Sequence, residues 1–156
     1  MRILLLACCA PLALGACAGA PRPIELRQVG VSSQCHTPDK SARAELLPDA
    51  AHVRAWQKAR AVTLVQEPKD VPHVVVELGV RHTAGYSVDL QPEAQVQGDL
   101  LTVIIVQHAP GAGDMSAQVI TTPCALGQLP EDDYAEVDAR SQGGYLWATS
   151  RAGAKP

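Results

Sequence analysis

VVVELGVRHTAGYSVDLQPEAQVQGDLLTVIIV, residues Val74–Val106, is the most concentrated β-forming stretch of the chain. Its first part, Val74–Val80, is rich in β-branched residues, as strands are. From Tyr86 to Gln91 apolar and polar residues alternate, which is the two-residue period of a half-buried strand. Gln97–Asp99 has the composition of a turn, and Leu100–Val106 is almost entirely apolar. We therefore expect three strands here, the last of them central in its sheet.

Shorter strand signals lie on both sides of this stretch. Four segments have strand-like composition, and a Ser-Gln-Gly-Gly sequence at 141–144 separates two further segments in the manner of a hairpin. The expected strands are Ile24–Val29, Val62–Val65, Met115–Ile120, Cys124–Leu129, Tyr134–Asp138 and Tyr145–Thr149.

One helix is expected, from Pro48 to about Arg60. Proline suits the first turn of a helix, and Asp49 places a negative charge at the positive end of the helix dipole. Val53 and Trp56 lie three residues apart on one face, so Trp56 is expected to anchor the helix beneath the sheet. The predicted fold class is α+β and mostly antiparallel β, either a small β-sandwich or a curled sheet with one packed N-terminal helix.

The N-terminus has the form of a lipoprotein signal. Arg2 precedes a short apolar run, and Leu14–Cys17 reads Leu-Gly-Ala-Cys, a lipobox. The run is too short for a membrane-spanning helix, which needs about 20 residues. We expect residues 1–16 to be a signal peptide and Cys17 to carry the lipid. The alternative is an ordinary secretory signal cleaved near Ala16 or Ala18.

This reading divides the chain into four parts. Residues 17–23 would be the lipid anchor and a short tether, 24–150 a single β-rich domain, and 151–156 a frayed tail. The expected location is the cell envelope, with the membrane as a partner through the lipid. Ala18, rather than an aspartate, follows Cys17, and this favours the outer membrane in a cell that has one.

The charge and the cysteine content bear on the possible partners and on the expected disulfide. The formal net charge is −3, with no basic run, so we expect no nucleic-acid partner. Of the five cysteines, Cys8 and Cys9 would leave with the signal and Cys17 would be lipidated. Cys35 and Cys124 remain, and in an oxidising compartment an even pair is expected to form a disulfide. Two buried thiols are the alternative.

No catalytic or metal-binding pattern is present in the sequence. A Gly-x-Ser-x-Gly elbow is missing, the histidines lack zinc-ligand spacing, and the acidic run 131–133 lacks the spacing of an EF-hand. We therefore expect no enzymatic activity, no cofactor and no metal. His82 and His108 are interpreted as solvated loop residues rather than as a pH-sensitive contact.

The segment Glu77–Val88, with the sequence ELGVRHTAGYSV, resembles the PrcB family, named for a subunit of a cell-surface protease complex. That family has an apolar strand ending in glycine, then T-G-G-Y-S, then an alternating strand; here Ala84 replaces the middle glycine. The resemblance continues through the Pro-Gly-Ala-Gly loop at 110–113 and covers roughly 46–138. If position 84 required a positive φ, alanine would cost about 1 kcal/mol relative to glycine.

The resemblance implies a lipoprotein that binds a partner, in the founding case a secreted protease, without a catalytic site of its own. A protease-associated or stabilising subunit is thus the leading expectation. The residues expected to contact the partner form two loops: His82, Thr83, Ala84, Gly85 and Tyr86 in the first, and Pro110, Gly111, Ala112 and Gly113 in the second.

Two alternative functions remain. The same loops resemble two of the three loops that chagasin-type cysteine-protease inhibitors present from an immunoglobulin-like sandwich. Such inhibitors also carry an Asn-Pro before the first loop and an Arg-Pro-aromatic loop, and both are missing here. The other alternative is an envelope lipoprotein with a structural role.

Overall fold

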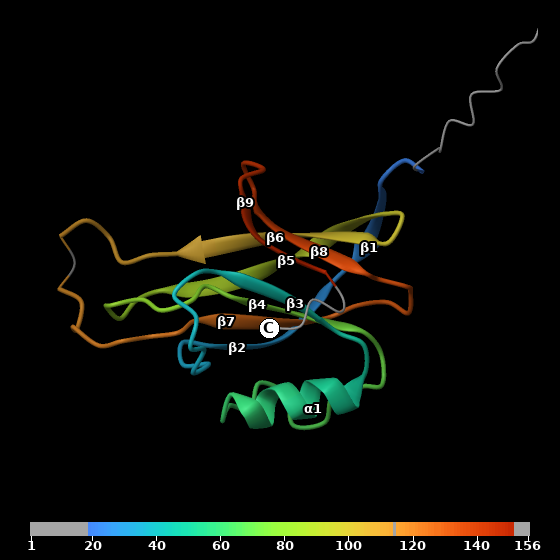
Figure 1. Ribbon diagram of the computed structural model, residues 1–156. Coiled ribbons are helices and arrows are strands. Elements are labelled where there is room, and N and C mark those ends of the chain that lie inside the picture. The colour runs from blue at the N-terminus through green and yellow to red at the C-terminus, as the bar shows by residue number, and fades with distance from the viewer. Residues whose placement is uncertain (1–18, 114, 152–156) are drawn as a thin grey trace, which may run out of the picture.

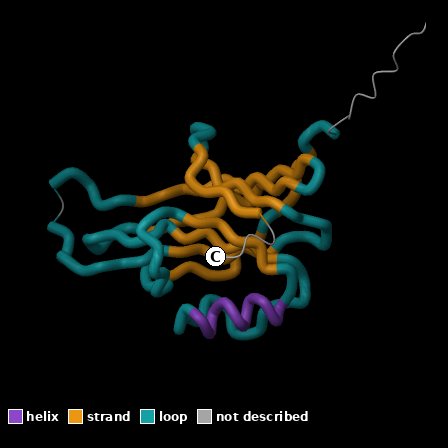
Figure 2. Tube along the Cα trace, in the orientation of Figure 1, coloured by secondary structure: helices purple, strands orange, loops and turns teal. Residues whose placement is uncertain are grey.

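The computed structural model describes residues 19–113 and 115–151, and it shows two stacked β-sheets with one helix beneath them (Figures 1 and 2). The five-stranded sheet has the order β1 (Arg22–Glu25), β5 (Ser87–Gln97), β6 (Leu100–His108), β8 (Glu136–Ser141) and β9 (Leu146–Arg151). The four-stranded sheet has the order β2 (Arg27–Ser32), β7 (Cys124–Gln128), β4 (His73–Glu77) and β3 (Arg43–Leu47). The helix α1 spans Ala50–Ala59. The expected α+β sandwich is confirmed.

The two sheets are antiparallel except for one pair. β6 and β8 run parallel, whereas every other neighbouring pair among the described strands is antiparallel. β6 is the middle strand of its sheet, as the apolar run predicted, and the turn at Gly98 joins it to β5. The stretch Val74–Val106 therefore supplies a strand to each sheet, and the loop 78–86 carries the chain from one sheet to the other.

β4 is buried on both faces. Val74 and Val76 point into the core between the sheets, while Val75 points to the other side, where it packs with Trp56 and Leu126. All five residues of the strand are buried. Because both faces of this strand are covered, neither face needs polar side chains. Apolar and polar residues therefore do not alternate along it, and three valines follow one another.

The helix begins later than expected. Asp49 has an extended backbone and its carboxylate accepts a hydrogen bond from the His52 amide at 2.9 Å, so Asp49 is the N-cap and Pro48 precedes the helix. These bonds from His52 lower the pKa of the Asp49 carboxyl. Trp56 is buried against the four-stranded sheet, as predicted. No helix in the described part of the chain has the length and apolarity to cross a membrane.

A buried ion pair holds the helix to β4. The Arg60 guanidinium donates to both carboxylate oxygens of Glu77, at 3.1 Å each, and it also lies 5.8 Å from the ring centroid of Trp56. The Glu77 side chain is only 1% exposed. Two parallel hydrogen bonds of this kind fix orientation as well as distance, so the pair sets how the C-terminal end of α1 meets the sheet.

The predicted strand at Val62–Val65 is wrong. The Gln57 side-chain oxygen accepts from the amides of Leu64 and Val65, at 2.7 and 2.9 Å, and its nitrogen donates to the Val65 carbonyl at 3.0 Å. In a strand, these backbone groups would form hydrogen bonds with a neighbouring strand. Here they are bonded to the side chain of Gln57 in the helix. Local hydrogen bonds from a polar side chain compete with the β-ladder here.

The predicted first strand is in fact two strands in different sheets. The chain crosses between the sheets at Leu26, whose side chain is buried in the core and whose amide donates to the Pro92 carbonyl at 2.7 Å. The strand β1 also begins at Arg22, inside the expected tether. At the other end, Arg151 belongs to β9 rather than to the expected tail, and residues 152–156 lie outside the described residues.

Cys35 and Cys124 form the expected disulfide, and the alternative of two free thiols is wrong. Both cysteines are fully buried in the core between α1 and the four-stranded sheet. The bridge joins residues 89 positions apart and so ties the loop after β2 to the start of β7. In the chain-entropy model a loop of this length stabilises by at most about 4–5 kcal/mol.

Replacing Arg60 by methionine should lower the free energy of unfolding by about 3–5 kcal/mol, because it leaves the Glu77 charge buried and unpaired. Urea denaturation would measure the loss. Arg54→Met, at an exposed position of the same helix, is the control and should change little. A double variant, Arg60→Met with Glu77→Leu, should recover part of the stability. If the single and double variants were equally unstable, the ion pair would not be the cause.

Stability should fall as the pH is lowered from about 7.5 to 5, partly through His73. Burial lowers the pKa of this histidine below its usual 6.5, and its Nδ1 lies 2.7 Å from the Val71 carbonyl oxygen. The unfolded chain therefore takes up a proton in a pH range where the folded chain does not, and acid favours unfolding. His73→Asn, which keeps a donor without the titration, should flatten the pH dependence of urea unfolding. An unchanged slope would contradict this assignment.

Candidate functional site

The two predicted loops lie together at one end of the sandwich. In Figure 1 the green loop before β5 and the orange loop after β6 both extend at the left of the view. A third segment, 117–121, is hydrogen-bonded to the first loop. We call residues 81–86, 110–113 and 117–121 the loop surface.

Backbone hydrogen bonds hold the first loop to the third segment. Arg81 and Thr121 exchange both amide-to-carbonyl bonds at 2.8 Å, and the Ala84 amide donates to the Ala117 carbonyl at 3.0 Å. The Thr121 hydroxyl adds a bond to the Thr83 carbonyl at 3.2 Å. Thr121 is buried although it lies in a loop region. The loop surface is therefore fixed in shape before any partner arrives, which reduces the entropy cost of binding.

Gly85 makes the contact between the two predicted loops. Its φ is +90°, and a Cβ added to it would lie 3.3 Å from the Cβ of Pro110. Ala84, in contrast, does not have a positive φ: among the described non-glycine residues only His36 and Ala61 do. The expected strain at Ala84 is thus absent, because the left-handed conformation falls on the glycine that this chain has kept.

The first loop begins at a second glycine that the fold requires. Gly79 has a φ of +77°, and a Cβ there would lie 2.6 Å from the carbonyl oxygens of Lys40 and Ser41. Any other residue would push the loop away from the segment between β2 and β3. The Leu-Gly sequence at the end of the strand signal therefore turns the chain out of β4 toward the loop surface.

Tyr86 is the one aromatic residue of the loop surface, and it is half-buried. The Arg81 guanidinium lies 5.8 Å from its ring centroid, and the same group donates to the Val80 carbonyl at 3.2 Å. The Val80 carbonyl and the Tyr86 ring thus both hold the Arg81 guanidinium in place. The side chain presents a positive charge beside an aromatic ring. Arginine and tyrosine are both enriched among the residues that contribute most to binding at the centres of protein interfaces.

The predicted strand Met115–Ile120 is wrong. The segment has no ladder partner beyond the bridge at Thr121, and three of its apolar side chains face solvent: Met115 is fully exposed, Val119 is 47% exposed and Ile120 is 65% exposed. The strand-like composition is real, but no core face lies beneath the segment. Sequence reasoning missed this segment as part of the site, because exposure of apolar residues cannot be read from their order.

The histidines of the two loops do not meet as a pair. His108 Nε2 lies 3.0 Å from Asp89 on the outer face of β5 and β6, and both side chains are about half exposed. Ser87 is opposite His108 in the strand register, so a serine, a histidine and an aspartate lie near one another. No hydrogen bond joins Ser87 to His108 among the described residues, and a nucleophile needs that bond. His82 is exposed.

Within residues 19–113 and 115–151, no three His, Cys, Asp or Glu side chains are grouped so that they could hold a metal ion. Cys17, the residue expected to carry the lipid, lies outside the described residues. What the loop surface offers is therefore shape, exposed apolar side chains and an arginine–tyrosine pair. These are the means of protein recognition.

The loop surface and the start of the described chain lie at opposite ends of the sandwich. Arg22 pairs with Val96 near one end of β5, while the first loop joins β5 at Ser87. At about 3.3 Å per residue the two ends are about 30 Å apart. Figure 1 shows the same separation, with the chain entering at the upper right and the loops at the left.

Gly85→Ala should disturb the second loop as well as the first, because a side chain at this φ is strained and would press on Pro110. We expect a loss of about 1 kcal/mol or more in urea denaturation, together with shifted amide NMR signals across 110–121. Gly98→Ala is the matched control: its φ is +63° but nothing lies within 4 Å of the added Cβ. It should lose stability without moving those signals. Unshifted signals in Gly85→Ala would mean that the loops are not in contact.

Comparison with known proteins identifies the segment that carries this site. A family model described as PrcB C-terminal matches residues 73–130, which run from β4 to just beyond β7 and include all of the loop surface. No curated protein matches the chain, and no solved structure does. The resemblance first seen in the segment Glu77–Val88 is thereby confirmed. Residues 73–130 of this chain are therefore similar to the PrcB C-terminal domain, and this is the part of the chain that carries the loop surface.

Proposed function

We propose that this protein is a lipid-anchored envelope protein without catalytic activity, and that its loop surface binds and stabilises a protease. The family match supports a role connected with a protease complex. The lipobox at Leu14–Cys17 supports an anchor on the outer face of a membrane, through acyl chains on Cys17.

The observation that carries the proposal is the exposed apolar group on the loop surface. Val119 and Ile120 lie on the segment 117–121, which is tied to the family's motif loop by the bonds at Ala84 and Thr121, and the exposed Met115 lies just before that segment. Isolated exposed apolar residues are ordinary, but several on one preformed surface are typical of a binding site. Covering them with a partner would bury apolar area at little cost in loop ordering.

The position of the loop surface fits a tethered binding protein. The strand β1 begins five residues after Cys17, at the end of the sandwich remote from the loops. A lipid on Cys17 would therefore hold that end near the membrane and direct the loop surface away from it, by about 30 Å. A protease bound there would remain clear of the lipid headgroups.

Protease inhibition is the second candidate, and one observation favours it. Gly85 packs against Pro110, so the two predicted loops form one projecting edge, which is the arrangement that an inhibitor of the chagasin type needs in order to enter a cleft. The proposals differ in their effect on the bound enzyme. A stabilising subunit prolongs protease activity, whereas an inhibitor reduces it at a stoichiometric dose.

The test is capture of the partner by the full-length chain in detergent, immobilised and exposed to envelope and secreted extract. Val119→Asp with Ile120→Asp should abolish retention of a protease, because charges replace the exposed apolar group. Tyr145→Asp is the control: Tyr145 is 69% exposed in the β8–β9 hairpin, outside the loop surface, and should leave retention intact.

Assay of the captured protease with added chain then decides between the two candidates. A longer active lifetime supports the stabilising subunit, and stoichiometric loss of activity supports the inhibitor. If no protease is retained while other envelope proteins are, neither protease-directed function holds, and a structural role in the envelope takes their place.

A further inference from the structure

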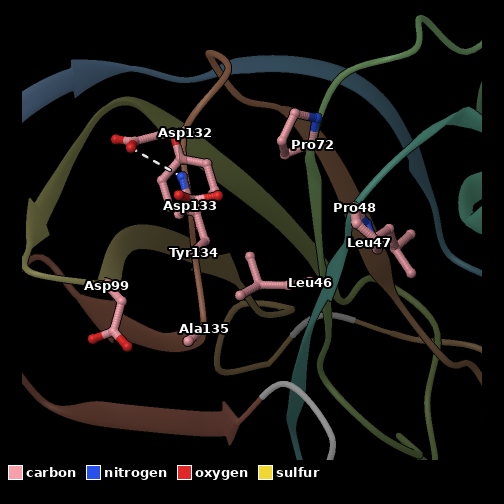
Figure 3. A pocket seen from close by; sticks show the side chains of 9 residues that line it. All are labelled: Leu46, Leu47, Pro48, Pro72, Asp99, Asp132, Asp133, Tyr134 and Ala135. Atoms are coloured by element: carbon pink, nitrogen blue, oxygen red, sulfur yellow. Dashed lines mark hydrogen bonds between the residues drawn. The ribbon is translucent and has the colours of Figure 1, made fainter.

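A pocket lies at the end of the sandwich opposite the loop surface. Its volume is about 450 Å³, and it opens between the two sheets. Figure 3 shows acidic residues on one side and apolar residues on the other. The lining residues are Leu46, Leu47, Pro48, Pro72, Asp99, Asp132, Asp133, Tyr134 and Ala135. We call this the acidic pocket.

The backbone around the acidic pocket is held by hydrogen bonds. The Asp99 carbonyl, in the turn between β5 and β6, accepts from the amide of Ala135 at 2.9 Å. The Pro72 carbonyl accepts from the Leu129 amide at 2.9 Å, and this bond fixes the apolar side. The walls come from four separate parts of the chain, so the pocket is preorganised rather than formed by one mobile loop.

The carboxylates on the acidic side of the pocket are only partly neutralised by basic side chains. Arg22 forms an ion pair with Asp132, so one of the three carboxylates already holds a guanidinium. Asp99 and Asp133 make no ion pair within the described part of the chain. Burial raises the pKa of Tyr134, so its phenol stays protonated and donates to the Pro130 carbonyl at 3.1 Å. The net charge around the opening is negative.

We propose that the acidic pocket binds an arginine side chain of a partner polypeptide. The aliphatic stem of arginine would lie on Leu46, Pro48 and Pro72, and the guanidinium would reach Asp99 and Asp133. The Tyr134 ring beside the carboxylates offers a further face for the cation. The pair of Arg22 with Asp132 is an internal example of the same recognition at the same opening. This binding is independent of the loop surface and of the protease proposal.

The charge and shape of the pocket favour this occupant over others. A purely apolar peptide would leave the carboxylates without a cation, and a small metal ion would not use the apolar wall. Carboxylates at the mouth of a partly enclosed pocket strengthen one another's attraction for a cation. An arginine flanked by apolar residues could pair its guanidinium with the carboxylates and pack its apolar neighbours on the apolar wall.

The test uses the full-length chain in a non-ionic detergent and two peptides, acetyl-Ala-Leu-Arg-Leu-Ala-amide and the same peptide with citrulline, which is the neutral isostere of arginine. Titration followed by ¹H–¹⁵N NMR gives both the affinity and the location. We expect the arginine peptide to shift the amide signals of Leu46, Asp99 and Tyr134 and to bind about fivefold to tenfold more tightly than the citrulline peptide. Raising the salt from about 50 mM to about 500 mM should weaken it.

Variants of the protein test which carboxylates bind the arginine side chain. Asp99→Asn with Asp133→Asn should reduce the affinity for the arginine peptide to that of the citrulline peptide. Asp132 is left unchanged because it pairs with Arg22. Glu93→Gln, an exposed carboxylate on β5 outside the pocket, removes charge elsewhere and should bind like the wild type. Matching spectra of the unbound variants would show that each one is folded.

Several results would overturn the proposal. Equal binding of the two peptides would exclude charge recognition, and so would wild-type affinity in the double aspartate variant. Shifts confined to residues outside the pocket, or no binding up to about 5 mM peptide, would exclude the site. Spermidine binding more tightly than the arginine peptide would assign the pocket to a small amine. The capture of a protease at the loop surface would be unaffected by any of these outcomes.

Discussion

Burial of β4 on both faces is the constraint on which the rest of the structure depends. A strand made of three consecutive valines loses apolar contact with water only if something covers each side. The five-stranded sheet covers Val74 and Val76, and α1 covers Val75. The three layers follow from this requirement. The buried pair of Glu77 with Arg60 then holds the helix layer against the strand, and the disulfide from Cys35 to Cys124 ties the loop after β2 to β7 in the same core.

The two ends of the sandwich differ in the side chains that they present. β4 ends at Glu77, and the left-handed Gly79 turns the chain toward the loop surface, which is apolar with a single arginine–tyrosine pair. At the other end of the sandwich, Pro72 lies just before β4. Pro72 and Asp99 both line the opening between the sheets, and that opening is acidic. Two unlike ends, about 30 Å apart, could contact two partners at once without competition between them.

Much of the loop surface could be predicted from the sequence because its signals are local. Glycine, threonine and proline at 83–85 and 110–113 mark turns, and the flanking β-patterns mark the strands that hold them. Their convergence could not be predicted in this way, since the contact of Gly85 with Pro110 depends on β5 and β6 pairing in register. Residues 117–120 were predicted as part of a strand. In the fold this segment has no core beneath its apolar residues, and the sequence alone does not show this.

The acidic pocket shows the limit of reading a chain in order. Leu46, Pro72, Asp99 and Tyr134 come from four separate segments, and none of these segments carries a motif. The acidic run 131–133 looks like a solvated turn until the Asp99 turn and the end of β3 are placed beside it. The same holds for Arg22, which in the sequence belongs to a tether and in the structure belongs to a strand with an ion pair to Asp132.

The sequence by itself determined the local elements: the β4 to β6 strands, one helix with its aspartate near the start, the hairpin at 141–144 and the cysteine pair. These depend on periodicity, backbone propensity and short motifs, which act over a few residues. Only the tertiary structure decided the sheet to which each strand belongs, the split at Leu26, the capture of residues 62–65 by Gln57, and the position of the left-handed glycine beside Ala84. Each of these is settled by contacts between residues distant in the chain, because the burial of a side chain and the bonding of a backbone group depend on what lies across from them.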